Sequence, residues 1–340
     1  MKEKILVTGG TGYIGSHTTV ELQEAGYDVV IIDNLSNSNV NVLKGIEKIT
    51  GKMPAFVEGD CTDLNTLKKL FKDHPGIKGI INFAASKAVG ESVKKPLLYY
   101  RNNLNTLINL LELMPENGVK GIVFSSSCTV YGEPDQNPID ETAPIKVATS
   151  PYGNTKQISE EIIEDYVKSG APIKSILLRY FNPVGAHPSG FIGELPLGIP
   201  QNLVPFLTQA AAGIRDELTV FGNDYNTPDG SCIRDYIDVV DLAKAHVVAM
   251  ERLLNNPDTP PVEIFNLGTG RGVSVLELIN AFEEATDVKV PHKIGARREG
   301  DIEKIWADPK RANEVLGWKA QADIKDTMRN AWKWQCNLSK

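Results

Sequence analysis

The chain has 340 residues, of which 41% are hydrophobic and 23% are charged. These proportions are typical of a globular protein with one large or two ordinary domains and a sizeable core. The formal charge of −7 argues against binding to nucleic acid or to an anionic membrane surface, because both attract basic proteins. An anionic ligand must therefore be held by a few placed cations and backbone amides.

Cysteine and histidine are sparse, which bears on metal and redox chemistry. The five histidines are scattered, and the four cysteines stand far apart, at Cys61, Cys128, Cys232 and Cys336. This spacing fits neither a zinc site nor a redox pair, so we expect no metal site. The apolar run near the N-terminus is too short for a signal peptide or a membrane span, and isolated cysteines then favour the cytoplasm.

The first half of the chain alternates between two kinds of segment. Apolar, β-branched runs predict strands over 4–8, 28–33, 77–83, 119–125 and 173–181, and helical patterns lie near 13–25, 63–72, 96–114 and 151–169. Continuously apolar strands separated by helices predict an α/β fold with a doubly wound, Rossmann-type parallel sheet.

The texture of the sequence changes after about residue 182, where Gly, Pro and Asn become frequent. We therefore predict a Rossmann domain over residues 1–182 and a smaller, loop-rich α/β lobe, mainly over 183–340. A predicted helix near 238–254 and a predicted strand near 262–267 are suited to the main sheet. Residues 238–270 are thus expected to rejoin the first domain, which would interleave the two lobes.

The first predicted strand runs into a glycine-rich turn at the start of a helix. Gly9, Gly12 and Gly15 form the pattern Gly-x-x-Gly-x-x-Gly. Glycines in this context permit a tight turn, let the backbone approach a pyrophosphate and allow close packing of helix on strand. The helix N-terminus then presents free amides and the positive end of its dipole to the phosphates. The turn therefore indicates a dinucleotide cofactor.

The end of the second predicted strand indicates which dinucleotide is bound. Asp33 closes this strand, 18 residues beyond Gly15. A carboxylate at this place binds the adenosine ribose hydroxyls and repels a 2′-phosphate. The residues that follow are short hydrogen-bonding groups without a cation, which favours NAD over NADP. These cofactor candidates are Asn34, Leu35, Ser36, Asn37 and Ser38.

Later strand ends are expected to line the same crevice, because ligands of open α/β sheets bind outside the carboxyl ends of the strands. Asp60 is a candidate acceptor for the adenine amino group, and Lys87 is long enough to reach a ribose hydroxyl. Small residues between these positions let a cofactor pass close to the backbone. The candidates at these ends are Asp60, Cys61, Phe83, Ala84, Ala85 and Lys87.

Tyr152 and Lys156 stand four residues apart just inside a predicted helix, so they share one helix face. The charge of a nearby ammonium group lowers the pKa of a phenol from its usual value of about 10. A tyrosine tuned in this way can take a proton from an alcohol near neutral pH. Ser127, at the end of the preceding strand, points to the same crevice.

Together these residues resemble the extended short-chain dehydrogenase/reductase superfamily, whose catalytic Ser, Tyr and Lys match Ser127, Tyr152 and Lys156. Further blocks narrow the resemblance to the UDP-glucose 4-epimerase family: 9–17, 87–92, 125–132, 178–190, 234–237 and 297–301. The resemblance runs nearly end to end. It implies tightly bound NAD, interconversion of UDP-glucose and UDP-galactose in galactose metabolism, and a homodimer formed through the helices near 96–114 and 151–169.

The resemblance also implies a mechanism. Tyr152 would take the proton from the sugar 4-hydroxyl while hydride passes from C4 to NAD⁺, and would later return the proton. The 4-keto intermediate would turn over within the site and receive the hydride on its other face. Lys156 would lower the pKa of Tyr152 and hold the nicotinamide ribose, and Ser127 would hydrogen-bond the reacting oxygen. The protein supplies position and charge, and the cofactor supplies the redox chemistry.

Further site residues follow from the same resemblance. Arg234 and Arg298 match arginines that bind the diphosphate, and Asp301 matches an acceptor for the uridine ribose. The other matched cofactor positions are Tyr13, Ile14, Asn102, Tyr180 and Phe181. The other matched substrate positions are Asn182, Asn202, Leu203, Thr219, Val220, Phe221 and Ile305.

Four positions depart from the family pattern. Ser86 replaces a larger residue that is common before Lys87. Cys128 stands where many members have alanine, and Asp238 stands where histidine is usual, for which the sequence offers no interpretation. Ile305 aligns with the position that sizes the hexose pocket and is smaller than the tyrosine common in bacterial members. The sequence therefore predicts room for a 2-acetamido group, and with it activity on UDP-GlcNAc and UDP-GalNAc.

Two alternatives stay open from the sequence. Another NDP-sugar epimerase, a dehydratase or a decarboxylase could share the fold, although a 4,6-dehydratase wants an Asp-Glu pair directly after the Ser, where Cys128 and Thr129 stand here. A uronate enzyme or a decarboxylase needs a group for the sugar carboxylate, and none is evident. A non-catalytic NAD sensor is the second alternative, since fold alone does not fix function.

Overall fold

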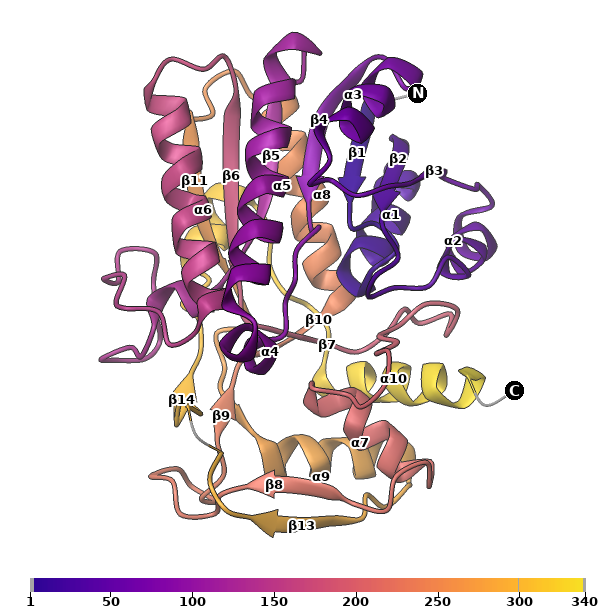
Figure 1. Cartoon of the computed structure of the whole chain (residues 1–340). Helices are drawn as coiled ribbons and strands as arrows, with labels where there is room; N and C mark the ends of the chain where they lie inside the picture. The colour runs from indigo at the N-terminus through magenta and orange to yellow at the C-terminus, as the bar shows by residue number, and fades with distance from the viewer. Residues whose placement is uncertain (1–2, 299, 339–340) are drawn as a thin grey trace.

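The computed structural model describes residues 3–298 and 300–338; Glu299, in the 297–301 block, lies outside the described residues. The chain forms two stacked lobes (Figure 1). A larger lobe contains most of the first half of the chain, and a smaller lobe lies beneath it. None of the helices among the described residues is long and apolar enough to cross a membrane.

A seven-stranded parallel sheet forms the centre of the larger lobe. Its spatial order is β11-β6-β5-β4-β1-β2-β3, so the chain reverses direction across the sheet between β1 and β4. This order confirms the predicted doubly wound Rossmann-type sheet. The strands are β1 (Lys4–Thr8), β2 (Asp28–Asp33), β3 (Ala55–Glu58), β4 (Ile77–Asn82), β5 (Gly121–Ser127), β6 (Lys174–Tyr180) and β11 (Val262–Leu267).

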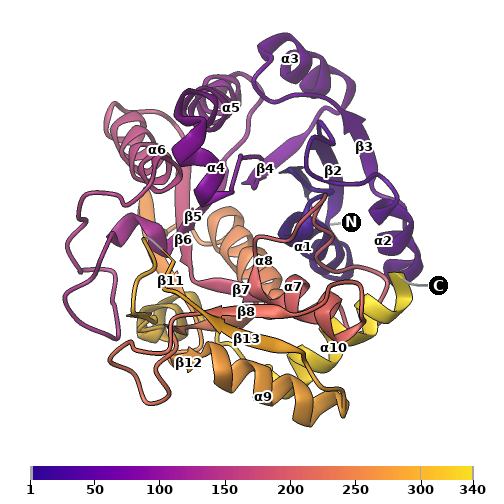
Figure 2. The same cartoon turned by 60° about the horizontal axis from the view of Figure 1, so that its bottom comes forward.

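Helices cover both faces of this sheet (Figure 2). One face packs on α1 (Tyr13–Glu24), α2 (Val42–Thr50) and α8 (Val239–Asn255). The other face packs on α3 (Leu64–Asp73), α5 (Pro96–Glu116) and α6 (Pro151–Lys168), with the short α4 (Val89–Lys94) against α5 and α6. Each face has its own apolar cluster, which explains why the strands are apolar on both sides.

The smaller lobe is built from short strands and three helices. The strand pairs are β7 (Asn182–Val184) with β10 (Tyr236–Asp238) and β8 (Leu218–Phe221) with β13 (His292–Gly295), and β9 (Ile233–Arg234) lies between β12 (Val273–Ser274) and β14 (Lys304–Ile305). The helices are α7 (Leu203–Ala211), α9 (Val275–Thr286) and α10 (Ile324–Leu338). Two short turns complete the fold: the 3₁₀ turn η1 (Cys128–Tyr131) and the π-helical turn η2 (Ala312–Leu316).

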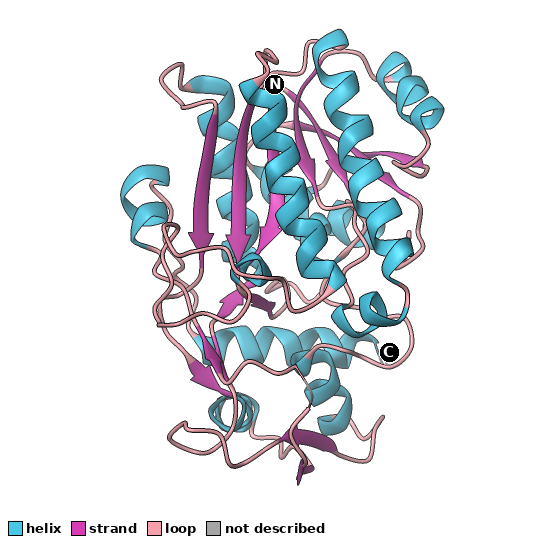
Figure 3. Cartoon of the chain, turned by 60° about the vertical axis from the view of Figure 1, so that its left-hand side comes forward, coloured by secondary structure: helices cyan, strands magenta, loops and turns pink. Residues whose placement is uncertain are grey.

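The two lobes share chain segments. After β10, the chain returns to the larger lobe as α8 and β11, and it then enters β12 of the smaller lobe. β11 pairs with β6 over its whole length, from Val262 opposite Ser175 to Leu267 opposite Tyr180. The carboxyl ends of the large-sheet strands point toward the smaller lobe (Figure 3), so any ligand outside these ends lies between the lobes.

Candidate active site

The parallel sheet brings the predicted site residues to one edge. Gly9, Asp33, Phe83, Ser127 and Tyr180 stand at or directly after the carboxyl ends of β1, β2, β4, β5 and β6. The order of the sheet reverses between β1 and β4, and a doubly wound sheet opens its binding crevice at such a point.

The glycine turn after β1 has the geometry that a phosphate needs. Gly9 has a φ of 69°, and a Cβ there would lie 2.8 Å from Ala84 N; at Gly15 a Cβ would lie 2.3 Å from Gly9 O. Gly12 caps α1 without any side chain bonded to the first-turn amides, and that turn holds no acid. A Cβ on Gly12 would meet only Gly9 O, at 3.1 Å. The turn thus leaves a positive, uncapped helix end that fits a pyrophosphate.

The carboxylate of Asp33 organises the loop that follows β2. Asp33 Oδ2 accepts from Thr11 N at 3.2 Å, and Oδ1 accepts from Leu35 N at 2.9 Å and Ser38 Oγ at 3.0 Å. Leu35 takes a left-handed φ of 56°, which bends the chain around the carboxylate. The structure thereby gathers residues 33–38 beside the glycine turn.

Asp60 lies next to this loop, because its Oδ2 accepts from Asn34 Nδ2 at 3.1 Å. Burial favours the neutral carboxyl, but hydrogen bonds from Thr62 and Asn34 outweigh it and lower the pKa of Asp60. The adjacent Cys61 is buried, and burial raises the pKa of its thiol. Asp60 is therefore ionised and can accept hydrogen bonds, whereas Cys61 is a buried, neutral thiol.

The turn after β4 packs against β1 and α8. Ala84 N donates to Thr8 Oγ1 at 3.2 Å, which ties this turn to β1, and the Phe83 ring lies 4.7 Å from His246 of α8. Lys87 Nζ lies 3.6 Å from Glu194 Oε1 in the loop after β7, and so it crosses from one lobe to the other. Asn102 donates to Ser86 Oγ at 3.2 Å on the same side.

Ser127, Tyr152 and Lys156 converge where β5 meets the start of α6. Ser150 caps α6 by accepting from Gly153 N at 3.1 Å, and this places Tyr152 in the first turn. Ser127 accepts from Thr129 N at 3.2 Å, and its side chain lies close enough to the Tyr152 hydroxyl to oppose the rise of that group's pKa. Lys156 Nζ donates to Ser125 O at 2.5 Å.

The ionisation of Tyr152 in the protein alone differs from the sequence-based expectation. Burial raises the pKa of Tyr152, and the Ser127 side chain opposes this rise only in part. Lys156 Nζ lies 5.8 Å from the centre of the Tyr152 ring and is bonded to a backbone carbonyl. Burial also lowers the pKa of Lys156 to about 8. The lysine therefore does not by itself make Tyr152 a tyrosinate.

The predicted diphosphate and uridine residues meet in the smaller lobe. Asp301 Oδ1 accepts from Arg298 Nη2 at 2.6 Å and lies 4.0 Å from Arg234 Nη2. The Arg298 guanidinium lies 5.4 Å from the centre of the Phe221 ring on β8. Two cations, one acceptor and one aromatic face thus stand together, as a nucleoside diphosphate requires.

Other predicted substrate residues are placed in less direct ways. Val220 of β8 and Ile305 of β14 are buried, 1% and 3% exposed, whereas Thr219 of β8 is partly exposed. Asn202 holds the N-cap position of α7, but its side chain bonds elsewhere: its amide donates to Glu194 Oε1 at 2.6 Å. Asn182 opens β7, opposite Tyr236. Phe181 packs in one apolar cluster with Ile305.

Three cofactor candidates remain: Tyr13 and Ile14 of α1, and Tyr180 of β6. Tyr13 donates its hydroxyl to Gly185 O at 2.7 Å, which links α1 to the loop after β7, and burial raises its pKa. Ile14 packs against the apolar cluster of its sheet face. Tyr180 lies at the end of β6 with its hydroxyl against Ser125 Oγ.

The structure gives Asp238 a role that the sequence did not. Asp238 caps α8, because its Oδ1 accepts from Val240 N at 2.8 Å, and its Oδ2 accepts from Thr327 Oγ1 of α10 at 2.8 Å.

Cys128 is partly exposed beside Ser127, and burial raises the pKa of its thiol to about 12. Nothing in the structure explains why cysteine stands there.

Sequence reasoning missed several residues around the site. Glu194 binds both Lys87 and Asn202, and Glu160 pairs with Arg179 beneath the catalytic candidates. An arginine inside an apolar strand was the available signal, since a buried guanidinium needs a partner.

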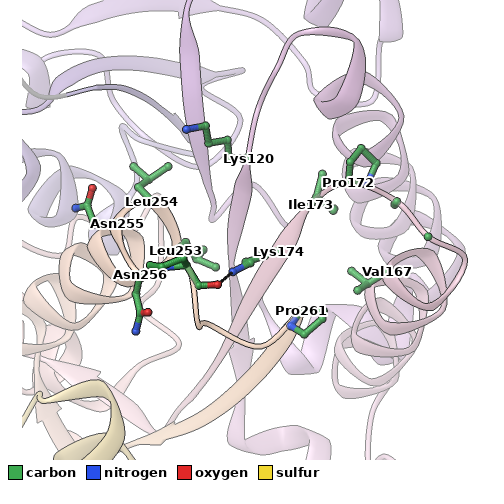
Figure 4. Close-up of a pocket in the computed structure, with 13 residues that line it drawn as sticks. Lys120, Val167, Pro172, Ile173, Lys174, Leu253, Leu254, Asn255, Asn256 and Pro261 are labelled. Atoms are coloured by element: carbon green, nitrogen blue, oxygen red, sulfur yellow. Dashed lines mark hydrogen bonds between the residues drawn. The ribbon is translucent and has the colours of Figure 1, made fainter.

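A surface groove of about 580 Å³ lies at the amino end of the sheet (Figure 4). Lys120 and Lys174 line it at the starts of β5 and β6, and Lys174 Nζ donates to Pro257 O at 2.7 Å. None of the predicted site residues contributes to it. Within the described part of the chain, no group of three or more His, Cys, Asp or Glu side chains is arranged to hold a metal ion.

Comparisons with known proteins identify the family of the chain. Residues 6–331 match the family model described as GDP-mannose 4,6 dehydratase. The chain is 51% identical to UDP-glucose 4-epimerase of Dictyostelium discoideum over 333 residues, which cover 98% of this chain and 96% of that one. It is also 52% identical over 334 residues to the bifunctional protein GAL10 of Pachysolen tannophilus, and spans 48% of that longer protein.

Solved structures agree in fold over the whole chain. The UDP-glucose 4-epimerase of Stenotrophomonas maltophila, solved with NAD and formylated UDP-arabinopyranose, superposes with a TM-score of 0.95 at 48% identity and covers 99% of both chains. The enzyme of Bifidobacterium longum, solved with NAD⁺ and UDP, gives 0.93 at 46% identity and 98% coverage of both. The chain therefore belongs to the UDP-glucose 4-epimerase family of the extended short-chain dehydrogenase/reductase superfamily.

Proposed function

We propose that the chain interconverts UDP-glucose and UDP-galactose with tightly held NAD, as an isomerase of galactose metabolism. The observation that carries this proposal is the meeting of Ser127, Tyr152 and Lys156 at the carboxyl end of β5, beside the uncapped start of α1. Relatives with NAD and UDP-sugars bound support the same ligands for this chain.

The residues divide the work between the two ligands. The amides of the α1 N-terminus hold the pyrophosphate, and Asp33 and Asp60 hold the adenosine end. Arg234 and Arg298 hold the UDP diphosphate, and Asp301 accepts from the uridine ribose. When bound, NAD supplies the hydride acceptor and the hydride donor of the reaction.

Tyr152 acts twice in each turnover. It first takes the proton from the sugar 4-hydroxyl, with Ser127 bonded to the reacting oxygen, and it returns the proton after the 4-keto sugar has presented its other face. The Lys156 ammonium stabilises the tyrosinate between these steps. Cys128 and Thr129 follow Ser127, and neither side chain can replace the acid–base pair that elimination of water needs.

A coupled assay tests this function. Purified protein is given UDP-galactose, and UDP-glucose is detected without added NAD. Turnover is expected from the cofactor that the protein carries through purification. No turnover, even with NAD supplied, would overturn the proposal.

We also propose activity on N-acetylated UDP-sugars, because Ile305 is smaller than the tyrosine found at this place in many relatives. Ile305 packs with Phe181 and Val130, next to the turn that carries Ser127. The substitution Ile305→Tyr should lower the ratio of UDP-GalNAc to UDP-galactose turnover. An unchanged ratio would contradict the idea.

We propose a homodimer through α5 and α6, and a location in the cytoplasm. Leu97, Leu98 and Ile108 of α5 are apolar and exposed by 74%, 48% and 37%, which supports a partner on this helix. The four free cysteines support a reducing compartment. Light scattering should show a dimer that Leu97→Glu converts to a monomer, and cell fractionation tests the compartment.

We also propose the division of the chain into two domains: residues 1–182 with 238–270 form one, and most of 183–340 forms the other.

A further inference from the structure

A buried ion pair lies directly beneath the proposed catalytic residues. Arg179 of β6 and Glu160 of α6 are 4% and 6% exposed. Arg179 binds the carboxylate as a fork, with Nε 3.0 Å from Oε1 and Nη2 2.6 Å from Oε2. Ser126 of β5 donates to Oε1 at 2.5 Å. One carboxylate thus ties a helix to two strands.

Each member of this pair adjoins a residue of the active site. Glu160 follows Lys156 by four residues, so the two side chains lie one turn apart on the buried face of α6. Ser126 lies between Ser125, whose carbonyl accepts from Lys156, and Ser127. Arg179 precedes Tyr180. A shift of α6 along the sheet would therefore break the Glu160 contacts and displace Lys156 at the same time.

The same network reaches the far side of Ser127. Arg179 Nη1 donates to Tyr131 OH at 3.0 Å, and Tyr131 OH donates to Asn266 Oδ1 of β11 at 2.7 Å. Tyr131 ends η1, the turn that Ser127 begins. The turn that carries the serine and the helix that carries the tyrosine are thus held by one guanidinium.

We propose that Glu160 is a positioning residue for the epimerisation: clamped by Arg179 and Ser126, it fixes α6 on β5 and places a negative charge one turn from Lys156. This inference rests on the proposed function. Fully buried ion pairs are costly and often contribute little net stability, so a pair retained at this place is better explained by what it positions.

The charge of Glu160 acts on Lys156 in a definite direction. Burial lowers the pKa of Lys156 to about 8, and Glu160 opposes the fall. The other groups that face the ammonium are Tyr152 on α6 and the Ser125 carbonyl and Phe124 ring on β5. On β6, the Arg179 guanidinium pairs with Glu160. Removal of the carboxylate charge should therefore lower the pKa of Lys156 further.

The test compares two substitutions that break the same ion pair. Glu160→Gln removes the charge, whereas Arg179→Lys loses the bidentate fork but keeps a negative charge at Glu160. Both should lower the melting temperature. Only Glu160→Gln should move the alkaline limb of the kcat/KM profile for UDP-galactose to lower pH, by about one unit, the scale of a nearby opposite charge. Alkaline limbs at the parent pH in both variants would overturn the inference.

A direct titration separates this inference from the proposed function. Protein labelled with ¹³C at the lysine ε-carbon is titrated by NMR, and the Lys156 signal is assigned by its loss in Lys156→Met. The pKa should fall in Glu160→Gln and stay at the parent value in Arg179→Lys, whether or not the protein turns over UDP-galactose. If Glu160→Gln does not fold, Glu160→Gln/Arg179→Gln leaves no lone buried charge and should show a fall in the same direction, smaller because the Arg179 charge is removed as well. An unchanged Lys156 titration would refute the role.

Discussion

Burial opposes the charged forms of both Tyr152 and Lys156. It raises the pKa of the phenol and lowers that of the ammonium to about 8, so in the protein alone a tyrosinate is disfavoured. The proposed mechanism needs the tyrosinate, and NAD⁺ would bring a positive charge to the same site. We infer that loss of a proton from Tyr152 is linked to binding of the oxidised cofactor.

The first prediction at the scale of the residue concerns the Tyr152 hydroxyl. Tyr152→Phe should lower kcat on UDP-galactose by about 10²–10⁴-fold, because positioned acid–base catalysis contributes that much. UDP affinity, measured by calorimetry, should stay near the parent value, since the proposed UDP contacts lie on Arg234 and Arg298. Turnover close to that of the parent would remove Tyr152 from the mechanism.

A second residue-scale prediction separates two glycines of the turn. A Cβ on Gly15 would lie 2.3 Å from Gly9 O, so Gly15→Ala must move the backbone and should lower the melting temperature strongly. A Cβ on Gly12 meets only Gly9 O at 3.1 Å but stands in the phosphate cradle. Gly12→Ala should therefore fold but bind NAD at least about tenfold more weakly than the parent. Equal NAD affinity in Gly12→Ala and the parent would contradict the cradle.

At the scale of the element, the long periodic segments were predictable and the short ones were not. The predicted helix near 151–169 is α6, Pro151–Lys168, because Ser150 and Pro151 mark its start. The end of β3 was expected just before Asp60, but its four-residue range was not predicted, since an edge strand with half-buried side chains has little apolar signal. The small-lobe strands have only two to four residues, too few for a periodic pattern to predict their bounds.

Asp238 allows an element-scale prediction about α8. The carboxylate caps this helix and accepts from Thr327, so Asp238→Ala removes a cap and leaves a buried hydroxyl without its acceptor. The free energy of unfolding should fall by about 2 kcal/mol. Asp238→Asn keeps an acceptor oxygen for the cap and should lose less. Denaturant titration measures both variants, and equal losses would argue against the cap.

At the scale of the whole molecule, the carboxyl-end rule places the site from sequence, because parallel strands bring distant residues to one edge. Asp33 and Ser127 are far apart in the chain, but they end two strands of the same sheet, β2 and β5. The rule does not reach contacts between lobes. Two such contacts are the ion pair of Lys87 with Glu194 and the hydrogen bond from Tyr13 to Gly185. They depend on the paths of loops between the lobes, and no periodic sequence pattern predicts those paths.

Two buried histidines on one face of the sheet make the stability of the whole molecule depend on pH. His17 of α1 and His246 of α8 are 1% and 0% exposed, and burial lowers their pKa values to about 3 and about 4. An unfolded chain would protonate each near its ordinary pKa of about 6.5. Below that pH the unfolded state therefore holds more protons, and stability falls as the pH falls toward about 4. Glu21 opposes this trend, because burial raises its pKa to about 7.

The substitution His246→Leu isolates one of these protons. Between about pH 6 and pH 4.5, the free energy of unfolding of the parent should fall more steeply than that of the variant by about 1.4 kcal/mol per pH unit. Above pH 7.5 both states hold a neutral histidine, so the difference between the two curves should be constant there and serves as the internal control. Urea titrations at half-unit intervals of pH measure both curves. Parallel curves down to pH 4.5 would mean that His246 is protonated in the folded protein, and that the packing of α8 against Phe83 and Tyr180 tolerates its charge.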